Sequence, residues 1–198
     1  MSKSTMKRGI LIICIMYAFV SSITAQVKDN KNSLPAYAIK TNALYWATTT
    51  PNLGFEIGLS DKFTLDLSGN YNPWTFSDSK KLKHWLVQPE LRYWTCERFN
   101  GHFFGLHAHY AEYNVGGIKM LGLKDHRYQG NLYGAGVSYG YHWILNKRLS
   151  IEATIGVGYA YLDYDKYPCG KCGTKLKDGH KNYFGPTKAG VSLIYILK

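Results

Sequence analysis

Hydrophobic residues alternate with small or polar residues, at a period of two, along most of this chain. The pattern is clearest from Asn131 to Tyr164, where two alternating stretches flank a short polar turn. Successive side chains of a β-strand point to opposite faces, so this region predicts a hairpin with one apolar, aromatic face and one small, polar face. The apolar row consists of Tyr133, Ala135, Val137, Tyr139, Tyr141 and Trp143, then Ile151, Ala153, Ile155, Val157, Tyr159 and Tyr161.

The same period recurs across the chain and predicts eight strands. They cover residues 37–48, 53–59, 63–67, 85–93, 104–110, 133–143, 151–161 and 189–197. Pro89, in the fourth strand, has no amide donor, so we expect a bulge or a missing ladder bond there. Short connections follow the second, fourth and sixth strands. Long connections follow the third, fifth and seventh strands, at Pro73–Lys83, Val115–Gln129 and Asp165–Lys181, and the connection at Thr49–Asn52 is an exception because it is short.

Charged residues lie on the small, polar row and are nearly absent from the apolar row. The inner polar set is Glu56, Asp66, Glu90, Arg92, His107, His109, Glu152 and Lys188. A transmembrane barrel turns its uncharged row toward lipid. We therefore predict an all-β fold over residues 36–198: an eight-stranded antiparallel up-and-down transmembrane β-barrel with short periplasmic turns and longer outer loops. A soluble secreted barrel is the alternative, but it would bury the apolar row and expose the charges.

Aromatic residues near the predicted strand ends support a membrane location. A transmembrane barrel carries girdles of aromatic side chains at its two interfaces. We assign to these girdles Trp74, Trp85, Trp94, Tyr141, Trp143 and Tyr161.

The first 25 residues have the pattern of a secretory signal peptide. Lys3, Lys7 and Arg8 precede the apolar run Ile10–Val20, and small residues then lead to Ala25. That run is shorter than the about 20 residues of a membrane-spanning helix. Residues 26–35 are polar and aperiodic, which predicts a flexible leader. Export to the outer membrane follows from these assignments.

The chain has a net charge of +11, and much of the positive charge lies in the predicted long loops. On the cell surface, such loops would face the phosphates of lipopolysaccharide. We therefore expect outer-membrane lipids and lipopolysaccharide as partners. Nucleic acid is disfavoured as a partner because the protein is predicted to be exported.

Three stretches resemble a known family: KTNALYWATTTPNLGFEIGL at 40–59, WLVQPELRYW at 85–94, and the Gly/Tyr-rich terminal hairpins. The resemblance covers about residues 36–198. It is to a family of unknown function, of small outer-membrane β-barrel proteins in Bacteroidota whose genes often lie beside fimbrial assembly genes. The resemblance implies no catalytic residues, and it suggests fimbrial or other envelope proteins as partners. One departure is the C-terminus, which ends in Lys198 instead of the aromatic residue that many outer-membrane proteins have.

The inner polar set is best interpreted as a structural ion-pair network, because eight strands leave an interior only wide enough for side chains. A proton- or ion-conducting path is the competing interpretation. His107 and His109 face the same way, and two imidazoles at this spacing can bind a metal. They would need Glu90 or Glu152 as a further ligand across the lumen. Hydrogen-bonded lumen histidines are the favoured interpretation.

The cysteine pattern predicts one small-loop disulfide. Cys169 and Cys172 lie in the sequence PCGKCG, and the oxidising export route favours a bridge between them. A metal knuckle that borrows His180, or a redox pair, is the alternative. Cys96 is expected to be a free thiol or simply a tolerated residue.

These patterns favour a non-enzymatic outer-membrane barrel with a structural or surface-interaction role, linked through the family resemblance to fimbria or adhesin biogenesis. We expect no cofactor. One alternative is an envelope lipid-modifying enzyme, for which Ser77 or Ser79 near His84, or His102 with a nearby serine, are the only loose candidates. The other is a soluble secreted ligand-binding barrel.

Overall fold

The computed structural model describes residues 34–74, 81–118, 123–168 and 176–197. Leu34–Lys198 forms one compact unit. The predicted signal peptide, and the predicted bridge between Cys169 and Cys172, lie outside the described residues. No helix in the described part of the chain is long and apolar enough to cross a membrane.

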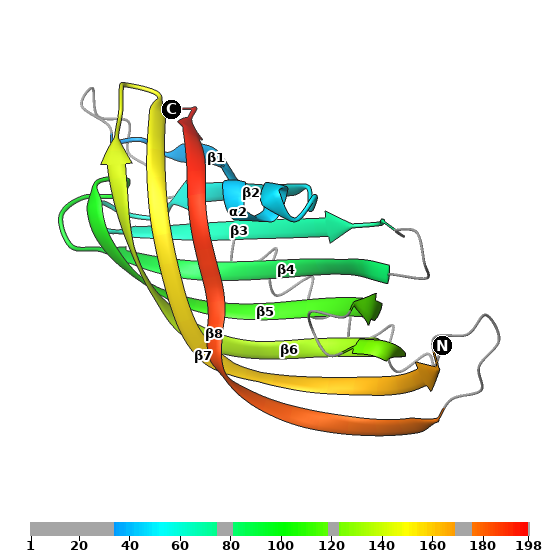
Figure 1. The fold of residues 1–198 in the computed structure, drawn as a ribbon. Helices are drawn as coiled ribbons and strands as arrows, with labels where there is room; N and C mark the ends of the chain where they lie inside the picture. Colours follow the sequence, from blue (N-terminus) through cyan, green and yellow to red (C-terminus); the bar gives the residue numbers. More distant parts are fainter. Residues whose placement is uncertain (1–33, 75–80, 119–122, 169–175, 198) are drawn as a thin grey trace, which may run out of the picture. The chain divides into compact units, whose positions relative to one another are not determined.

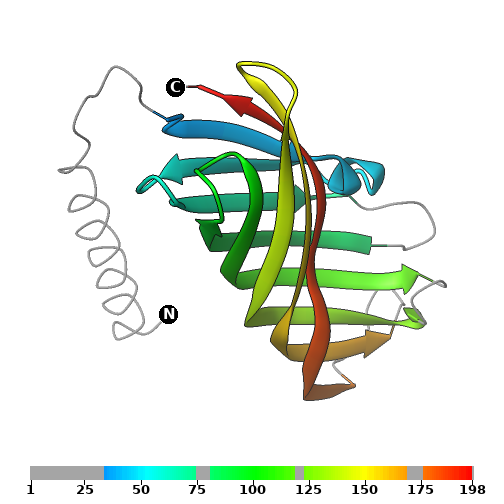
Figure 2. The ribbon, with the colours of Figure 1, turned by 90° about the vertical axis from the view of Figure 1, so that its left-hand side faces the viewer.

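Eight antiparallel strands form a closed barrel in which each strand pairs with its neighbours in sequence (Figure 1). The ring closes where β8 pairs with β1, and these two strands run side by side in Figure 2. The predicted up-and-down topology is therefore confirmed. The strands are β1 (Tyr37–Asn42), β2 (Asn52–Gly58), β3 (Phe63–Asn72), β4 (Lys81–Trp94), β5 (Gly101–Ile118), β6 (Leu123–Ile144), β7 (Leu149–Pro168) and β8 (Lys177–Ile196).

Three predicted elements were wrong in part: the end of the first strand and two of the long loops. The first strand ends at Asn42, because the Asn42 side chain accepts a hydrogen bond from the amide of Leu44 and begins the short helix α2 (Ala43–Ala47). Most of Val115–Gln129 and part of Asp165–Lys181 are not loops. They continue the β5–β6 and β7–β8 ladders, in register, well past the aromatic stretches.

These extensions are rich in polar residues, so they lack the apolar alternation that predicts a strand. β5, β6, β7 and β8 reach 18, 22, 20 and 20 residues, whereas β1 and β2 have only 6 and 7. One side of the barrel wall is thus much taller than the other. The tall side extends to the right in Figure 1.

Pro89 interrupts the ladder without shifting it. The β4–β5 pairing runs through Val87↔Tyr110 and resumes at Glu90↔His107 in the same register, with neither Gln88 nor Pro89 paired to β5, while Pro89 keeps Leu67 of β3 as its partner. Of the two predicted outcomes, the missing ladder bond is therefore correct and the bulge is not.

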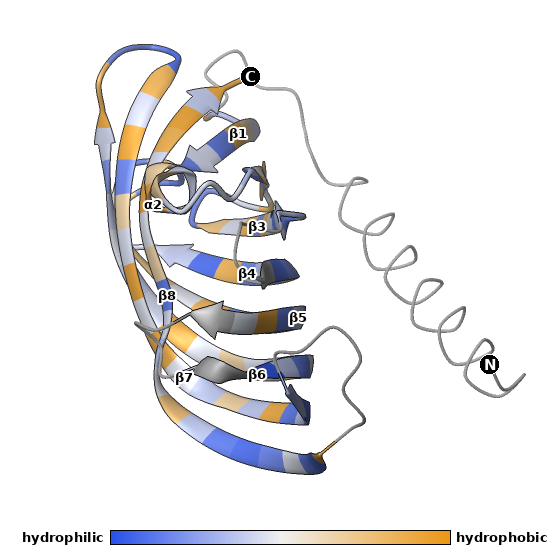
Figure 3. Cartoon of the chain, turned by 45° about the vertical axis from the view of Figure 1, so that its right-hand side comes forward, coloured by the Kyte–Doolittle hydropathy of each residue, from blue (hydrophilic) through white to orange (hydrophobic). Residues whose placement is uncertain are grey.

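Residue alternation sets the two surfaces of the wall. Outward positions are apolar and exposed, whereas inward positions are mostly buried and, except at the short-turn end, are small, polar or charged. Figure 3 shows this as alternating hydrophobic and hydrophilic bands along the strands. Glycines on the inner row leave space for larger inward side chains from neighbouring strands. At Gly136, for instance, an added Cβ would lie 2.8 Å from Nε2 of His107.

An apolar plug fills the barrel at the end that carries the short turns. Trp94 and Phe103 pack with their ring centroids 4.9 Å apart, and Trp94 donates a hydrogen bond from Nε1 to Thr64 Oγ1. The complete plug is Ala38, Trp94, Phe99, Phe103, Ile194 and Ile196, all buried. The assignment of Trp94 to an outer girdle was therefore wrong: it lies on the inward, even-numbered row of β4, with Arg92.

We predict that Gly140→Ala destabilises the barrel by about 1–3 kcal/mol, because a Cβ at this inward position would collide with the Phe103 ring of the plug. Gly69→Ala is the matched control, since its Cβ would have a single neighbour, at 3.8 Å. Urea unfolding of the refolded protein measures both free energies of unfolding. Equal stabilities for the two variants would contradict the close packing of the plug.

Candidate functional site: the buried charge cluster and the cavity beyond it

Seven charged side chains from six strands meet inside the barrel. They are Lys40, Glu56, Asp66, Glu90, Arg92, Glu152 and Lys188, which we call the lumen charge cluster. Each is buried or nearly so, with side-chain exposures between 0% and 11%. The cluster contains three cations and four carboxylates, so most of its charge is compensated internally.

Arg92 lies at the centre of the cluster. Its Nη1 is 3.0 Å from Glu56 and 2.8 Å from Glu152, its Nη2 is 3.2 Å from Asp66, and its Nε is 2.7 Å from Glu90. The planar guanidinium carries five N–H donors, so a single side chain can bond all four carboxylates. Arg92 thereby ties β4 to β2, β3 and β7, and its Cζ lies 4.3 Å from the centre of the Phe103 ring.

Two lysines complete the charge balance. Lys40 Nζ lies 2.8 Å from Glu56 and 3.0 Å from Asp66, and Lys188 Nζ lies 2.9 Å from Glu90. Lys188 was predicted from the sequence, whereas Lys40 was missed. Lys40 lies two residues after the small inward residue Ala38, and this spacing places both on the same face of β1. The irregular alternation of the YAIKTNALYW stretch made that face hard to recognise in the sequence.

His107 and His109 lie beside the cluster, on its β5 side. His107 shares a hydrogen bond of 2.9 Å with Thr187 Oγ1, and its Nδ1 lies 3.6 Å from Glu90. Glu152 lies beside another histidine, His142, whose Nδ1 is 3.8 Å from Glu152 Oε2. His142 is buried and was not predicted from the sequence as a lumen residue. Within the described ranges, no group of three or more His, Cys, Asp or Glu side chains is arranged to hold a metal ion.

The space within the cluster is small. A void of about 40 Å³ lies among Lys40, Asp66, Arg92, Glu152 and Lys188. A volume of this size holds about one water molecule. The apolar plug lies between this void and the short-turn end of the barrel. The described part of the lumen is thus filled by side chains and does not form an open aqueous channel.

A larger cavity of about 430 Å³ lies toward the opposite end, at the tall wall. It is lined by β3, β4, β5, β6 and β7, and it centres on Asn72, His84, Tyr113, Gly130 and Tyr164, which are successive register partners across these strands. β3 and β7 are four strands apart in a ring of eight. Because a cavity that touches both must lie within the ring, we call it the rim cavity.

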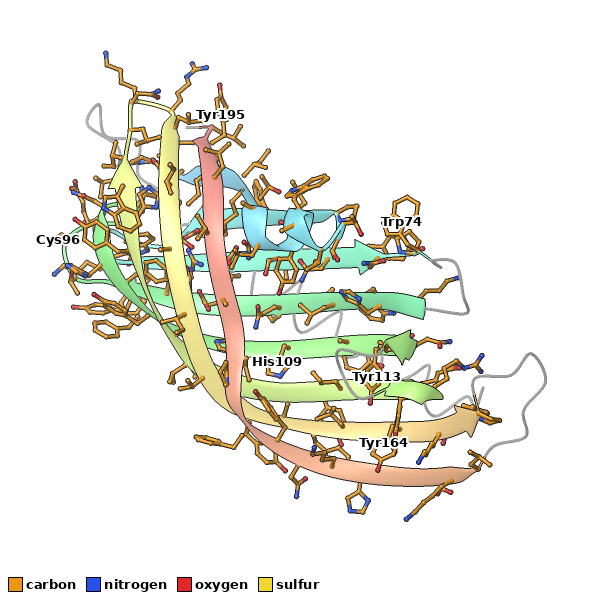
Figure 4. The ribbon with its side chains drawn as sticks, in the orientation of Figure 1. Trp74, Cys96, His109, Tyr113, Tyr164 and Tyr195 are labelled. Carbon is orange, nitrogen blue, oxygen red and sulfur yellow. The ribbon has the colours of Figure 1, made fainter. Side chains whose placement is uncertain are left out.

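Tyr113 and Tyr164 are labelled in Figure 4 on the extended parts of β5 and β7. Burial, with smaller contributions from Asp163 and Tyr164, raises the pKa of Tyr113. Its phenol therefore keeps its proton at neutral pH and remains a hydrogen-bond donor. The polar and aromatic lining of the rim cavity was not identified from the sequence, because most of these residues lie between the ends of the predicted strands and the predicted long loops.

The remaining candidates from the sequence are dispersed. Ser77 and Ser79 lie outside the described residues, and the ring of His102 contacts the hydroxyl of Tyr139 at 2.6 Å. Cys96 is exposed on the β4–β5 turn as a free thiol. On the outer surface, Trp46 and Trp74 line a separate apolar hollow beside α2, together with Thr49 and Pro51.

Comparison with known proteins gives one match. The model of a family described as "Protein of unknown function (DUF3575)" matches residues 10–197. The chain belongs to this family. No curated protein and no solved structure matches it. As a DUF3575 member, the chain inherits no assigned activity, and its chemistry must be inferred from the lumen charge cluster, the rim cavity and the outer surface.

We predict that Arg92→Met destabilises the protein by about 3–5 kcal/mol, because it leaves four buried carboxylates facing only two lysines. Arg92→Lys should lose less stability, since it keeps the charge but not the bidentate geometry. Lys147→Met, on an exposed turn, is the control for removal of a positive charge. Equilibrium unfolding in detergent provides the measurement. An Arg92→Met variant within about 1 kcal/mol of the Lys147→Met variant would contradict a central role for Arg92.

Proposed function

We propose that this protein is a non-enzymatic outer-membrane barrel, held in the bilayer by its apolar outer row, that presents its tall wall for interactions at the cell surface. Short turns and both ends of the barrel chain would lie on the periplasmic side. The link to fimbria or adhesin biogenesis stays a prediction from the family resemblance.

The outer surface of the barrel carries the proposal. Large apolar side chains face outward from every strand, including Leu106 with 62% and Val137 with 57% of its surface exposed. Other members of this outer row are Ile39, Leu53, Phe55, Leu67, Val87, Leu91, Ile155, Val157, Val191 and Leu193. Soluble monomers rarely expose a contiguous apolar surface of more than a few hundred Å². A continuous belt around a barrel is the surface that a bilayer covers.

The height of this belt supports the same conclusion. On β6 the outward apolar run extends from Tyr133 to Trp143, which agrees with the about 9–11 residues of a tilted transmembrane strand. Beyond it the outward row becomes polar, with Asn131 on β6 facing its register partners Glu112 and Asp163. The belt therefore ends well before the tall wall does, and the rest of the wall projects past it.

Aromatic side chains mark both edges of the belt. Tyr110, Tyr133 and Tyr161 are register partners at the edge near the tall wall. At the opposite edge, Phe63 pairs with Tyr93, with their ring centroids 5.3 Å apart. Such girdles place amphipathic rings at the level of the lipid headgroups.

The inner surface explains why the alternative of a soluble barrel is weaker. A soluble barrel gains its stability from an apolar interior, whereas this interior holds the lumen charge cluster. The charged groups form ion pairs with one another instead of lining a path for a substrate. A structural or interaction role therefore accounts for them better than an envelope enzyme does.

We predict that Val137→Arg prevents assembly into the outer membrane, because a charge at the bilayer midplane on the lipid side costs about 2–4 kcal/mol. Val137 lies mid-belt, between its register partners Leu106 and Val157. Asn131→Arg is the matched control, since it lies on the same face of the same strand beyond the belt. Cell fractionation and heat-dependent gel migration report the folded protein in the membrane.

The two positions distinguish a bilayer from water. If the outer row faced water, Val137→Arg would be harmless and would improve solubility. Recovery of the wild-type protein in a soluble periplasmic or secreted fraction, or normal membrane levels of Val137→Arg, would therefore reject the proposal.

A further inference from the structure

The ring of strands is closed over only part of the length of β8. β1 has 6 residues and β8 has 20, so β1 pairs with β8 only from Ser192 to Ile196. β7 pairs with β8 as far as Lys177. In the described part of the chain, no strand pairs with the other side of β8 between Lys177 and Ala189. Figure 1 shows this stretch of β8 as the last strand of the tall wall, with no strand beyond it.

Backbone hydrogen bonds at the end of β8 show which residues face each neighbour. The amide of Ile196 donates to the carbonyl of Arg148, on the β7 side, and the amide of Leu197 donates to the carbonyl of Tyr37 in β1. Successive residues of a strand direct their N–H and C=O groups to opposite sides. Near the end of β8, even-numbered residues therefore face β7 and odd-numbered residues face β1.

A β-bulge at Thr187 reverses this alternation, because the register between β7 and β8 skips this residue. Pro186 then directs its backbone away from β7, a position that suits a residue without an N–H donor. Its carbonyl accepts a hydrogen bond of 3.3 Å from the hydroxyl of Tyr183. His180 and Asn182 share the direction of Pro186, so their backbone N–H and C=O groups also point away from β7.

The Asn42 side chain replaces ladder bonds at the point where β1 ends. Its Nδ2 donates to the carbonyl of Ala189 at 3.1 Å, and its Oδ1 accepts from the amide of Val191 at 3.2 Å. Together with the contact from Tyr183 to Pro186, these bonds satisfy backbone groups on the lower part of the unpaired side. Such substitutes are needed within a bilayer, where no water can bond an exposed backbone group.

The first residues of β8 lie beyond the apolar belt. Asn182 is the register partner of Tyr161, an aromatic residue at the edge of the belt. Residues 177–182 therefore project past the bilayer, and we call their side that faces away from β7 the open edge. A row of backbone N–H and C=O groups at a sheet edge is a template for pairing with another extended chain.

Lysines line the inward face beside the open edge. Lys177 and Lys181 share a face of β8 with Gly179, whose register partner is Tyr164 on the inward row of β7. Both lysines are exposed. Lys166, the register partner of Lys177, lies on the same inward row. A strand added at the open edge would place alternate side chains next to this positive row.

This charge selects among the strands that could pair here. A second copy paired antiparallel about Gly179 would set Lys177 opposite Lys181 twice, and like charges directly opposite each other destabilise a strand pair. Carboxylates at the same positions would form favourable cross-strand pairs. We propose that the open edge accepts an extended strand of a partner protein in antiparallel pairing, and that this strand carries acidic side chains opposite Lys177 and Lys181.

This inference rests on the proposed function only for the location of the open edge outside the bilayer. Strand binding is measured on the purified protein, so it can fail while cell fractionation still places the protein in the membrane. Conversely, a failure of the membrane proposal in cells leaves the binding measurement intact.

The test uses the full-length mature protein, purified in detergent and shown to be folded by heat-dependent gel migration. The probe is a short fluorescent peptide that alternates glutamate with valine or threonine, and fluorescence anisotropy measures its binding. We expect saturable binding that weakens as salt is added, because salt screens the attraction between exposed charges. The same peptide with lysine in place of every glutamate should bind about tenfold more weakly.

Methylation of the peptide backbone separates strand pairing from simple charge attraction. When the glutamates lie opposite the lysines in an antiparallel pair, the valine and threonine amides point toward β8 and the glutamate amides point away. Methylation of the valine and threonine nitrogens should therefore abolish binding. Methylation of the glutamate nitrogens is the matched control and should leave the affinity close to that of the unmodified peptide.

Variants of the protein test the same contacts from the other side. His180→Pro removes one donor of the open edge without removing a bond to β7, and it should weaken binding of the acidic peptide by about tenfold. Lys181→Glu should shift the preference toward the lysine peptide. Lys147→Glu makes the same charge change on an exposed turn at the opposite end of the barrel and should bind like the wild type.

Three results would overturn the proposal. One is the absence of saturable binding of the acidic peptide by protein that is demonstrably folded. The second is binding that neither His180→Pro nor the position of the methyl groups changes, which would reduce the contact to charge attraction. The third is a dimer of the wild-type protein in sedimentation velocity that His180→Pro abolishes, which would assign the open edge to a second copy of this chain.

Discussion

The contacts of Arg92 with four carboxylates are the interaction on which the rest of the barrel depends. An eight-stranded barrel has too little interior for an apolar core as large as that of a soluble domain, and this lumen is filled by charges instead. Four carboxylates packed together would repel one another strongly without a central cation. Arg92 supplies that cation from β4 and bonds carboxylates on β2, β3, β4 and β7. The same contacts that neutralise the lumen therefore hold distant parts of the wall together.

The lumen contents change in a definite order along the barrel. The aromatic plug around Trp94 and Phe103 closes the short-turn end, the lumen charge cluster follows, and His107 and His109 lie next to it. The rim cavity begins where β1 and β2 have ended and only the taller strands continue. Structural groups thus occupy the part of the barrel within the apolar belt, and the open, aromatic site lies beyond it. Because of this separation, residues that line the rim cavity can be substituted without loss of the contacts that hold the barrel together.

Much of this architecture follows from period-two alternation. It predicted eight strands, their up-and-down order and the inward direction of residues such as Glu56 and Glu152, because a strand with two different faces leaves a strong periodic signal. The signal weakened in three places. Asn42 begins a helix through a side-chain hydrogen bond that no periodicity records. The extensions of β5 to β8 alternate polar residues with other polar residues. Trp94 was assigned to a girdle because it lies at a strand end, although its spacing of two from Arg92 already placed it on the inward row.

Convergence of side chains was the least predictable feature. The contact of Lys40 with Glu56, and the row from Asn72 to Tyr164, depend on ring closure and on the register between strands. Neither can be read from the spacing within one strand. The eight predicted lumen residues were identified by their face, but which of them bond to one another required the structure.

The most direct test of the central claim is a cysteine scan of β6 from Tyr133 to Trp143. Single cysteines are introduced after Cys96, Cys169 and Cys172 are changed to serine, and the mature protein is reconstituted in vesicles that contain a lipid-borne fluorescence quencher. An account in which the apolar row faces lipid predicts that labels at Ala135, Val137 and Tyr139 are quenched by the lipid and protected from water-soluble thiol reagents. Rapid reaction of these outward positions with a water-soluble reagent, without quenching by the lipid, would contradict it.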